Sequence, residues 1–350
     1  MKSFQPGFLQ HHPLSHNLLT TIHQLGEYKG KEDLFKKQYP QVLENLKKEA
    51  VIHSTESSNR IEGVTAPFPR IKSLVEGNAQ PQNRSEQEIA GYKKVLSTVH
   101  ENWKNMDFTP NVILQMHRDL FQFTNQPGGT WKSTNNEIIE NRNGQTFIRF
   151  KPVEPHLTPE YMSQLHRGYQ DHKQEGLVDP LLLIASYIMD FLCIHPFRDG
   201  NGRMARLIAL WLLYKEGYEV GKYISLEKII EQTKDGYYDT LNKGDQGWHN
   251  SQHNLSSWWE YFLGVMLLGA YKEFERRAEE FKSTKGAKAD AIEAAIQRLP
   301  HRFTLGDVEE ACPYAAHATI QRALRHMRDA GEIQLISKGR TAQWEKTKRT

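Results

Sequence analysis

Residues His195–Arg206 read HPFRDGNGRMAR, and this stretch decides the fold of the chain around it. The residues before it, Leu181–Ile194, are almost continuously apolar and long enough for a buried helix. Because Pro196 disfavours helical geometry at the preceding residue, that helix is predicted to end at His195. A second apolar run, Met204–Tyr214, predicts a second buried helix. The quoted stretch is therefore predicted to connect two buried helices.

The residue types in this connection suit a metal-bound polyphosphate. Gly200–Gly202 falls at the start of the second helix, where unpaired N–H groups and the helix dipole attract anions. Arg203 and Arg206 are three apart, so they are neighbours on the helix surface, and guanidinium groups suit phosphate oxygens. Asp199 is a hard oxygen ligand for Mg²⁺, and His195 can accept a proton near neutral pH. Each residue alone also fits a plain turn or helix boundary, but together they predict a phosphate site beside a general base.

The pattern His-Pro-Phe-x-Asp/Glu-Gly-Asn-Gly-Arg-x-x-Arg is the signature of Fic domains, and the chain matches it at every fixed position. Members of this family typically transfer AMP from ATP to a hydroxyl group of a target protein. The resemblance implies that His195 deprotonates the target hydroxyl and that Asp199 binds Mg²⁺ on the α- and β-phosphates. It also implies an ATP-binding set, with backbone and amide donors at Gly200, Asn201 and Gly202 and distal-phosphate contacts at Arg203 and Arg206.

A second segment resembles the inhibitory helix of the same family. Residues Ser58–Gly63 read SNRIEG and match the pattern Ser/Thr-x-x-x-Glu-Gly/Asn. Ser58 and Glu62 are four apart and share a helix face, and Gly63 is a natural helix stop. By resemblance, Glu62 pairs with Arg206 and restrains the transfer of AMP. An alternative role for Glu62 is to position water and remove AMP from a modified target. Read alone, the segment would be a short capped surface helix.

A hairpin is predicted over residues 135–150, with Asn143-Gly144 as its turn. It follows Gly129–Lys132, which resembles the approach to the flap of the family, although the family often has arginine where Lys132 stands. In the family the flap pairs with the backbone of the target protein by strand addition. The residues expected to dock the target are Asn136, Glu137, Ile138 and Ile139. The alternative is an ordinary surface loop.

Two tyrosines after the signature, Tyr237 and Tyr238, resemble the pair that lines the adenine side of the ATP site. Core packing is an equally good interpretation of either residue. ATP itself is implied by the family, so another nucleotide donor stays open.

The composition is that of a soluble intracellular protein, and a cytoplasmic location is expected. The chain has 350 residues, of which 38% are hydrophobic and 25% charged, enough to bury real cores. No N-terminal signal pattern and no apolar run of membrane-spanning length is seen. Cys193 and Cys312 do not suggest a disulfide framework. A net charge of +3 does not by itself argue for nucleic acid.

The chain is predicted to divide into three parts. Residues 1–85 form a helical region with the inhibitory segment, residues 86–275 the catalytic core, and residues 287–350 a separate small domain. The fold class is mainly α: a helical Fic fold with a small β-hairpin flap and a C-terminal winged-helix domain. The oligomeric state is left open.

The winged helix is inferred from the pattern of residues 287–350. Three helices are expected at 291–299, 305–311 and 316–330, with a turn at 300–304 between the first two. Two strands, 332–336 and 341–344, are expected around a basic turn, Lys338-Gly339-Arg340. Such a module would place its third helix in the major groove of DNA, which makes a DNA-binding regulator the second function to consider. An exposed basic helix is also a common solvated face, and winged helices also bind proteins. If the chain instead transfers AMP, its partner would be a target protein or the chain itself.

Overall fold

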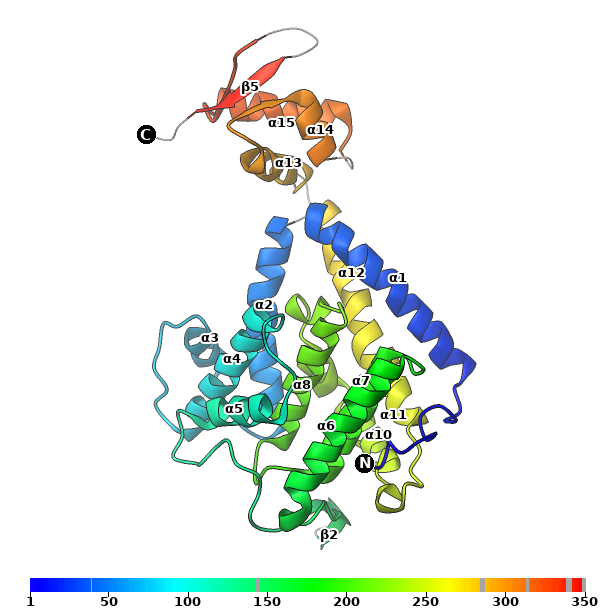
Figure 1. Ribbon diagram of the computed structural model, residues 1–350. Coiled ribbons are helices and arrows are strands. Elements are labelled where there is room, and N and C mark those ends of the chain that lie inside the picture. The colour runs from blue at the N-terminus through cyan, green and yellow to red at the C-terminus, as the bar shows by residue number, and fades with distance from the viewer. Residues whose placement is uncertain (39, 143–144, 284–286, 313–314, 338–341, 348–350) are drawn as a thin grey trace. The chain divides into compact units, whose positions relative to one another are not determined.

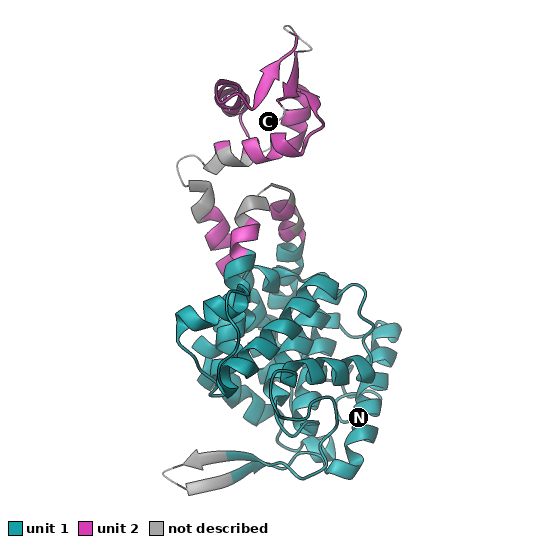
Figure 2. Ribbon diagram, turned by 90° about the vertical axis from the view of Figure 1, so that its left-hand side faces the viewer, with its two compact units in different colours: residues 1–29, 47–272 teal, residues 30–46, 273–350 magenta. Residues whose placement is uncertain are grey.

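The chain forms two compact units. The computed structural model describes residues 1–38, 40–142, 145–283, 287–312, 315–337 and 342–347. Residues 1–29 and 47–272 make up the first unit, and residues 30–46 and 273–350 make up the second (Figure 2). The three-part division at 1–85, 86–275 and 287–350 stays a prediction. The compact units are cut at other places, because residues 47–85 share a unit with the core.

The first unit is built of helices and one hairpin (Figure 1), and the prediction of a mainly helical fold with a small β-hairpin is confirmed. Three helices extend beyond the residue limits of this unit, namely α1, α2 and α12. The elements are α1 (His16–Gln38), α2 (Pro40–Ile61), α3 (Phe68–Val75), α4 (Arg84–Asn102), α5 (Pro110–Phe121), β1 (Ile138–Arg142), β2 (Gln145–Phe150), η1 (Pro155–Leu157), α6 (Thr158–Glu175), α7 (Pro180–Ile194), α8 (Asn201–Lys215), η2 (Val220–Lys222), α9 (Leu226–Gln232), α10 (Lys234–Gly244), η3 (Trp248–Asn250), α11 (Ser256–Trp259), η4 (Glu260–Leu267) and α12 (Leu268–Ser283).

Helices α7 and α8 form the centre of this unit and match the two apolar runs of the sequence. They pack against each other, α6 lies along α7, and α4 lies against α8 (Figure 1). Pro180 begins α7, and the Asp179 carboxylate caps it by accepting from the Leu181 N–H at 2.8 Å. The helix ends at Ile194, as predicted from Pro196, and almost every side chain of both helices is buried. The connection between them is therefore anchored at both ends by the core.

The end of α2 is fixed to the elements that follow the signature. The Ser57 hydroxyl donates to the Glu231 carboxylate at 2.7 Å, and Lys234 donates to the Ile61 carbonyl at 3.3 Å. Gly63, with φ near +80°, ends the helix in the left-handed conformation that glycine adopts without strain. These contacts hold Ser58–Gly63 against α9 and α10, and hydrogen bonds from Arg206 of α8 to Ser58 and Glu62 bind the same segment.

The proline-rich stretch after the inhibitory segment is partly helical. Prolines at 67, 69 and 81 suggest an irregular linker, yet α3 forms between them. Pro67 and Pro69 stand at the helix start, where a missing N–H costs nothing. Ile71 and Leu74 are buried against Ile89 of α4, and this apolar contact stabilises the short helix.

The predicted hairpin is present as the antiparallel pair β1 and β2. Ile139 pairs with Ile148 and Arg142 with Gln145, and the register shifts between Ile138 and Ile139. The predicted turn residues Asn143-Gly144 lie outside the described residues.

The second unit ends in a small domain of three helices and a three-stranded sheet. Its strands lie in the order β3-β5-β4, and all neighbours are antiparallel. The prediction of a turn at 300–304 is wrong in part: Arg302–Thr304 form β3, because Phe303 is buried in the core. The predicted basic turn at 338–340 lies outside the described residues. The elements are α13 (Ala287–Arg298), β3 (Arg302–Thr304), α14 (Leu305–Ala311), α15 (His317–Asp329), β4 (Ile333–Leu335) and β5 (Gln343–Lys346).

Across the described part of the chain, every helix is too short or too polar to cross a lipid bilayer.

We expect Gly91→Ala to lower the free energy of unfolding by about 1–3 kcal/mol. Gly91 lies where α4 crosses α5, and a Cβ built there would fall 2.0 Å from the Leu120 carbonyl oxygen. Gly26→Ala is the matched control, because this exposed helical glycine has open space around it and alanine should stabilise the helix slightly. Urea unfolding followed by circular dichroism measures both, and equal stability of the two variants would contradict the close crossing of α4 and α5.

Candidate active site

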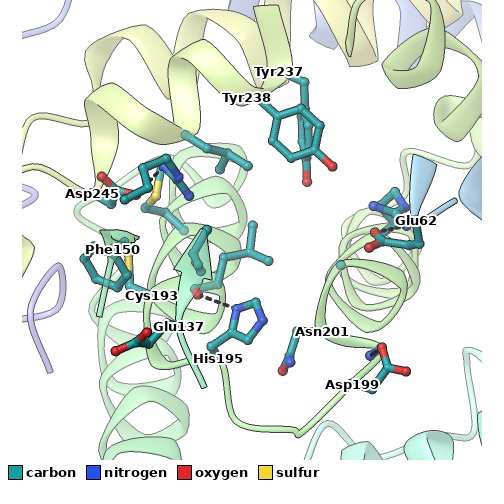
Figure 3. Close-up of a pocket in the computed structure, with 18 of the residues that line it drawn as sticks. Glu62, Glu137, Phe150, Cys193, His195, Asp199, Asn201, Tyr237, Tyr238 and Asp245 are labelled. Atoms are coloured by element: carbon teal, nitrogen blue, oxygen red, sulfur yellow. Dashed lines mark hydrogen bonds and ion pairs between the residues drawn. The ribbon is translucent and has the colours of Figure 1, made fainter. Parts of the chain in front are cut away.

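A cavity of about 290 Å³ opens beside the α7–α8 connection (Figure 3). Its walls come from the end of α2, the base of the hairpin, α7, the start of α8 and α10. The structure brings most of the predicted site residues to this one cavity, namely Glu62, Glu137, Ile138, His195, Asp199, Gly200, Asn201, Gly202, Arg206, Tyr237 and Tyr238.

His195 stands at the cavity in a constrained backbone conformation. It caps α7 with φ 50° and ψ 61°, a left-handed conformation that is uncommon outside glycine. Its Nδ1 lies 3.2 Å from the Leu192 carbonyl oxygen, which can only accept, so Nδ1 carries the proton and Nε2 is free to act as a base. Burial lowers the pKa of His195 to about 4. The ring is therefore neutral at neutral pH.

The start of α8 offers backbone donors to the cavity. Gly200 precedes the helix with φ 79°, and the first helical bond is accepted by its carbonyl from the Met204 N–H at 2.9 Å. The N–H groups of Asn201 and Gly202 therefore lie in the first turn, where a helix provides no acceptor. The Asn201 side chain is used to shape the loop: it accepts from the Phe197 N–H at 2.9 Å and donates to the Phe197 carbonyl at 2.7 Å. Because this side chain is occupied, Asn201 can offer a ligand its backbone N–H.

Asp199 supplies a half-exposed carboxylate at the mouth of the cavity. Its Oδ1 accepts from the Gly200 N–H at 2.6 Å and lies 3.6 Å from an Arg203 nitrogen. In the described residues no three His, Cys, Asp or Glu side chains gather around one point. One carboxylate beside a phosphate site fits Mg²⁺, which keeps several waters and takes further oxygens from phosphates.

Arg206 is buried and hydrogen-bonded to the end of α2. Its Nε donates to the Ser58 hydroxyl at 2.9 Å, and its Nη2 donates both to the Ser58 carbonyl at 2.9 Å and to Glu62 Oε1 at 2.8 Å. Burial would raise the pKa of Glu62, but the charge and hydrogen bond of Arg206 outweigh it and lower that pKa. Glu62 is therefore ionised at neutral pH.

The Glu62 carboxylate lies directly on the first turn of α8. A Cβ built on Gly202 would fall 2.2 Å from Glu62 Oε1 and 3.2 Å from an Arg206 nitrogen. The glycine thus makes room for an anion against the backbone, and in this structure that anion is the carboxylate of Glu62.

Arg203 lies behind the cavity rather than on its wall. It is 1% exposed, and its Nη1 donates to the Glu88 carboxylate at 2.7 Å. The same nitrogen lies 3.4 Å from Asn59 Oδ1, one residue after Ser58. Its predicted contact with the distal phosphates stays a prediction; in this conformation Arg203 joins α8 to α4 and α2.

The remaining predicted residues are placed as follows. Tyr237 is buried and Tyr238 is 41% exposed, and both rings line the cavity, so Tyr237 combines core packing with a cavity face. The Asn136 side-chain amide donates to the carbonyls of His195 and Phe197, and its predicted docking role stays a prediction. Ile139 is 58% exposed on the hairpin.

Several polar residues of the site were not found from the sequence. Arg149 of β2 donates to the Asp245 carboxylate at 2.7 Å and to Asn242 at 3.0 Å, and it lines the cavity with Asp245. Burial raises the pKa of Asp245 to about 6. Glu88 belongs to an unremarkable stretch of charged residues. No local pattern signals these pairs, because each joins residues far apart in the chain.

Comparison with known sequences identifies the domain that carries the site. Residues 107–213 match the family described as Fic/DOC, a range that contains α5, α7 and the signature. The chain therefore contains a Fic domain.

Curated relatives match a little over half of this chain. The protein adenylyltransferase Fic of Nematostella vectensis is 27% identical over 210 residues, which cover 57% of this chain and 44% of that protein. The protein of the same name from Culex quinquefasciatus is 27% identical over 212 residues, covering 59% and 39%. The chain thus spans less than half the length of these relatives.

Solved structures support the fold. A Fic family protein from Desulfovibrio desulfuricans G20 superimposes with a TM-score of 0.65 at 19% identity, covering 97% of this chain and 98% of that chain. Residues 134–508 of Fic-1 from C. elegans give a TM-score of 0.58 at 18% identity, covering 77% and 74%.

We expect the His195 ring to remain neutral at about pH 5.5, because burial disfavours the charged imidazolium. Glu62→Gln should lower the pKa of His195 further, since the Glu62 charge favours the imidazolium. Imidazole ¹⁵N shifts of histidine-labelled protein, assigned with His195→Ala, measure both. A His195 ring that titrates near its ordinary value of 6.5 would contradict the buried, neutral base.

Proposed function

We propose that this protein is an adenylyltransferase that moves AMP from ATP to a hydroxyl side chain of a target protein and releases pyrophosphate. One observation carries the proposal: a neutral histidine, a half-exposed carboxylate, helix-start N–H groups and Arg206 all face one cavity. The names of the curated relatives point to the same activity.

In the proposed reaction each of these cavity residues has one role. Nε2 of His195 takes the proton of the acceptor hydroxyl, whose oxygen attacks the α-phosphorus as the bond to pyrophosphate breaks. The N–H groups of Asn201 and Gly202 bind phosphate oxygens at the start of α8. Arg206 orients the distal phosphates once it is released from Glu62. Asp199 would hold Mg²⁺, which neutralises charge on the phosphates.

The acceptor is proposed to be a serine, threonine or tyrosine hydroxyl on another protein or on the chain itself. Glu137 and Ile138 lie on the cavity wall at the start of β1, and Ile139 is exposed on the same strand. A target segment added beside this strand would bring its side chain toward His195.

Glu62 is proposed to restrain this reaction. It holds Arg206 and lies on the first turn of α8, so it competes with a phosphate group for both donors. A lowered pKa makes Glu62 a weak base, which favours restraint over the alternative in which Glu62 activates water to remove AMP.

We expect Glu62→Gly to raise AMP transfer at least tenfold over the natural chain, because Arg206 and the α8 N–H groups become available to ATP. Transfer is measured from α-³²P-ATP onto the protein itself and onto proteins of a native lysate, followed by identification of the labelled band. Glu76→Gly is the matched control, since this exposed glutamate stands outside the cavity at the end of α3.

Adding His195→Ala to the Glu62→Gly chain should abolish labelling. If the Glu62→Gly chain binds Mg-ATP and labels no protein, the proposed transferase function is wrong. If the natural chain labels proteins as strongly as the Glu62→Gly variant, the proposed restraint by Glu62 is wrong.

A second candidate function is DNA binding by residues 287–350. The observation that favours it is α15, which buries Ile320, Leu324 and Met327 and exposes arginines on its other side. We propose that this domain is a winged helix with α15 as its recognition helix. In this second function the Fic domain would serve as a sensor or a self-modifying core.

For that candidate, we expect Arg322→Glu with Arg325→Glu to weaken binding of the full chain to a fluorescent DNA duplex and to flatten its salt dependence. Both arginines are exposed on α15. The control is Arg298→Glu, an exposed arginine at the end of α13. Fluorescence anisotropy across a salt series measures the effect, and duplex affinity that does not change with salt excludes the DNA-binding role.

A further inference from the structure

The loop that carries His195 is held by the segment that leads into the hairpin. Four consecutive carbonyl groups, those of residues 194–197, each accept a hydrogen bond from Lys132 or Asn136, and the Phe197 carbonyl accepts a further one from Asn201. The donors and distances are Lys132 N–H to Pro196 at 2.8 Å, Lys132 Nζ to Ile194 at 3.0 Å, and Asn136 Nδ2 to His195 at 3.2 Å and to Phe197 at 2.9 Å.

These two residues also hold each other. Lys132 Nζ donates to Asn136 Oδ1 at 2.8 Å, and Lys132 is only 4% exposed. Burial lowers the pKa of Lys132 to about 8, and within the described residues its ammonium is bound by carbonyl oxygens rather than by a carboxylate. A buried ammonium held only by neutral acceptors is costly, so its position calls for a function beyond filling space.

The backbone of His195 explains what the contacts achieve. A left-handed conformation at a residue with a side chain costs about 1–3 kcal/mol and persists only where its surroundings fix it. We propose that Lys132 and Asn136 form a clamp, defined by these contacts to residues 194–197, which holds His195 in this conformation and so sets where its Nε2 meets the acceptor hydroxyl. Both are positioning residues, and their catalytic consequence rests on the transfer reaction proposed above.

The clamp also joins the base to the strand proposed to receive the target. Asn136 stands two residues before β1, and Glu137 between them lines the cavity. A target segment added to β1 would therefore press on the same short stretch that fixes His195. Through it, the position of the base responds to the docking of the target.

The test compares variants in the full-length Glu62→Gly chain. Asn136→Asp keeps the acceptor for Lys132 and removes both donors to the loop, and Lys132→Met removes the ammonium. We expect each to lower the rate of AMP transfer at saturating Mg-ATP about ten- to hundredfold, the cost of a displaced reacting group. The Kd for Mg-ATP, measured by calorimetry, should stay within about twofold. Lys132→Arg should restore most of the rate, and Thr134→Ala, an exposed neighbour, should not change it.

A second measurement does not depend on AMP transfer. Long-range ¹H–¹⁵N spectra of the imidazole, assigned with His195→Ala, should show Nδ1 protonated and Nε2 bare in the Glu62→Gly chain. In Asn136→Ala made in that chain, we expect a mixture of both tautomers, because the ring is no longer held against Leu192. An unchanged His195 spectrum, with transfer within twofold of the parent chain, would overturn the clamp. If no variant transfers AMP, the proposed function fails, and the spectrum alone decides: a changed tautomer supports the clamp and an unchanged one overturns it.

Discussion

The buried charge of Arg206 is the constraint on which the rest of the site depends. A guanidinium that is 5% exposed must find its partners inside the protein, and its hydrogen-bond partners among the described residues come from the end of α2. Its neighbour Arg203 meets the same demand one turn earlier by pairing with Glu88 of α4. The two arginines therefore bind α8 to Glu88 and Glu62, which lie 115 and 144 positions earlier in the chain, and they fix the end of α2 over the cavity.

This arrangement makes the site attractive to any anion. The N–H groups at the start of α8, the helix dipole and Arg206 all favour negative charge at one point. The Glu62 carboxylate reaches that point within the protein, whereas a phosphate must arrive from solvent. In the proposed function, restraint is a competition between two anions for the same donors, and its strength is set by how well Arg206 is held by Glu62. Because Glu62 is nearly a third exposed, this contact is weaker than that of a fully buried ion pair.

The sequence predicted those features that short patterns determine. Continuous apolar runs identified α7 and α8, Pro196 located the end of α7, and the family signature named the residues that meet in the cavity. The direction of Arg203 was not predictable, because a spacing of three places two side chains near each other without saying which one faces the cavity. Strand β3 was not predicted, because three residues are too few to show a strand pattern. Helix α3 was not predicted either, because it is stabilised by contacts with α4 that its proline-rich sequence does not reveal. Pairs such as Arg149 with Asp245, and the contacts of Lys132 with the His195 loop, arise from tertiary folding alone.

Gly202 is shared by the proposed restraint and the proposed reaction, and this has a consequence for how the protein can evolve. The space left by its missing Cβ is filled by Glu62 in this structure, and the same space is where a phosphate would lie against α8. A side chain at this position would exclude both anions, so no single substitution there could release the restraint and keep a usable site. If the proposed restraint holds, a change that releases it and keeps the site usable falls at the distant end of α2 instead. In the proposed function, loss of restraint and loss of activity thus arise from mutations in different segments of the chain, and one can occur without the other.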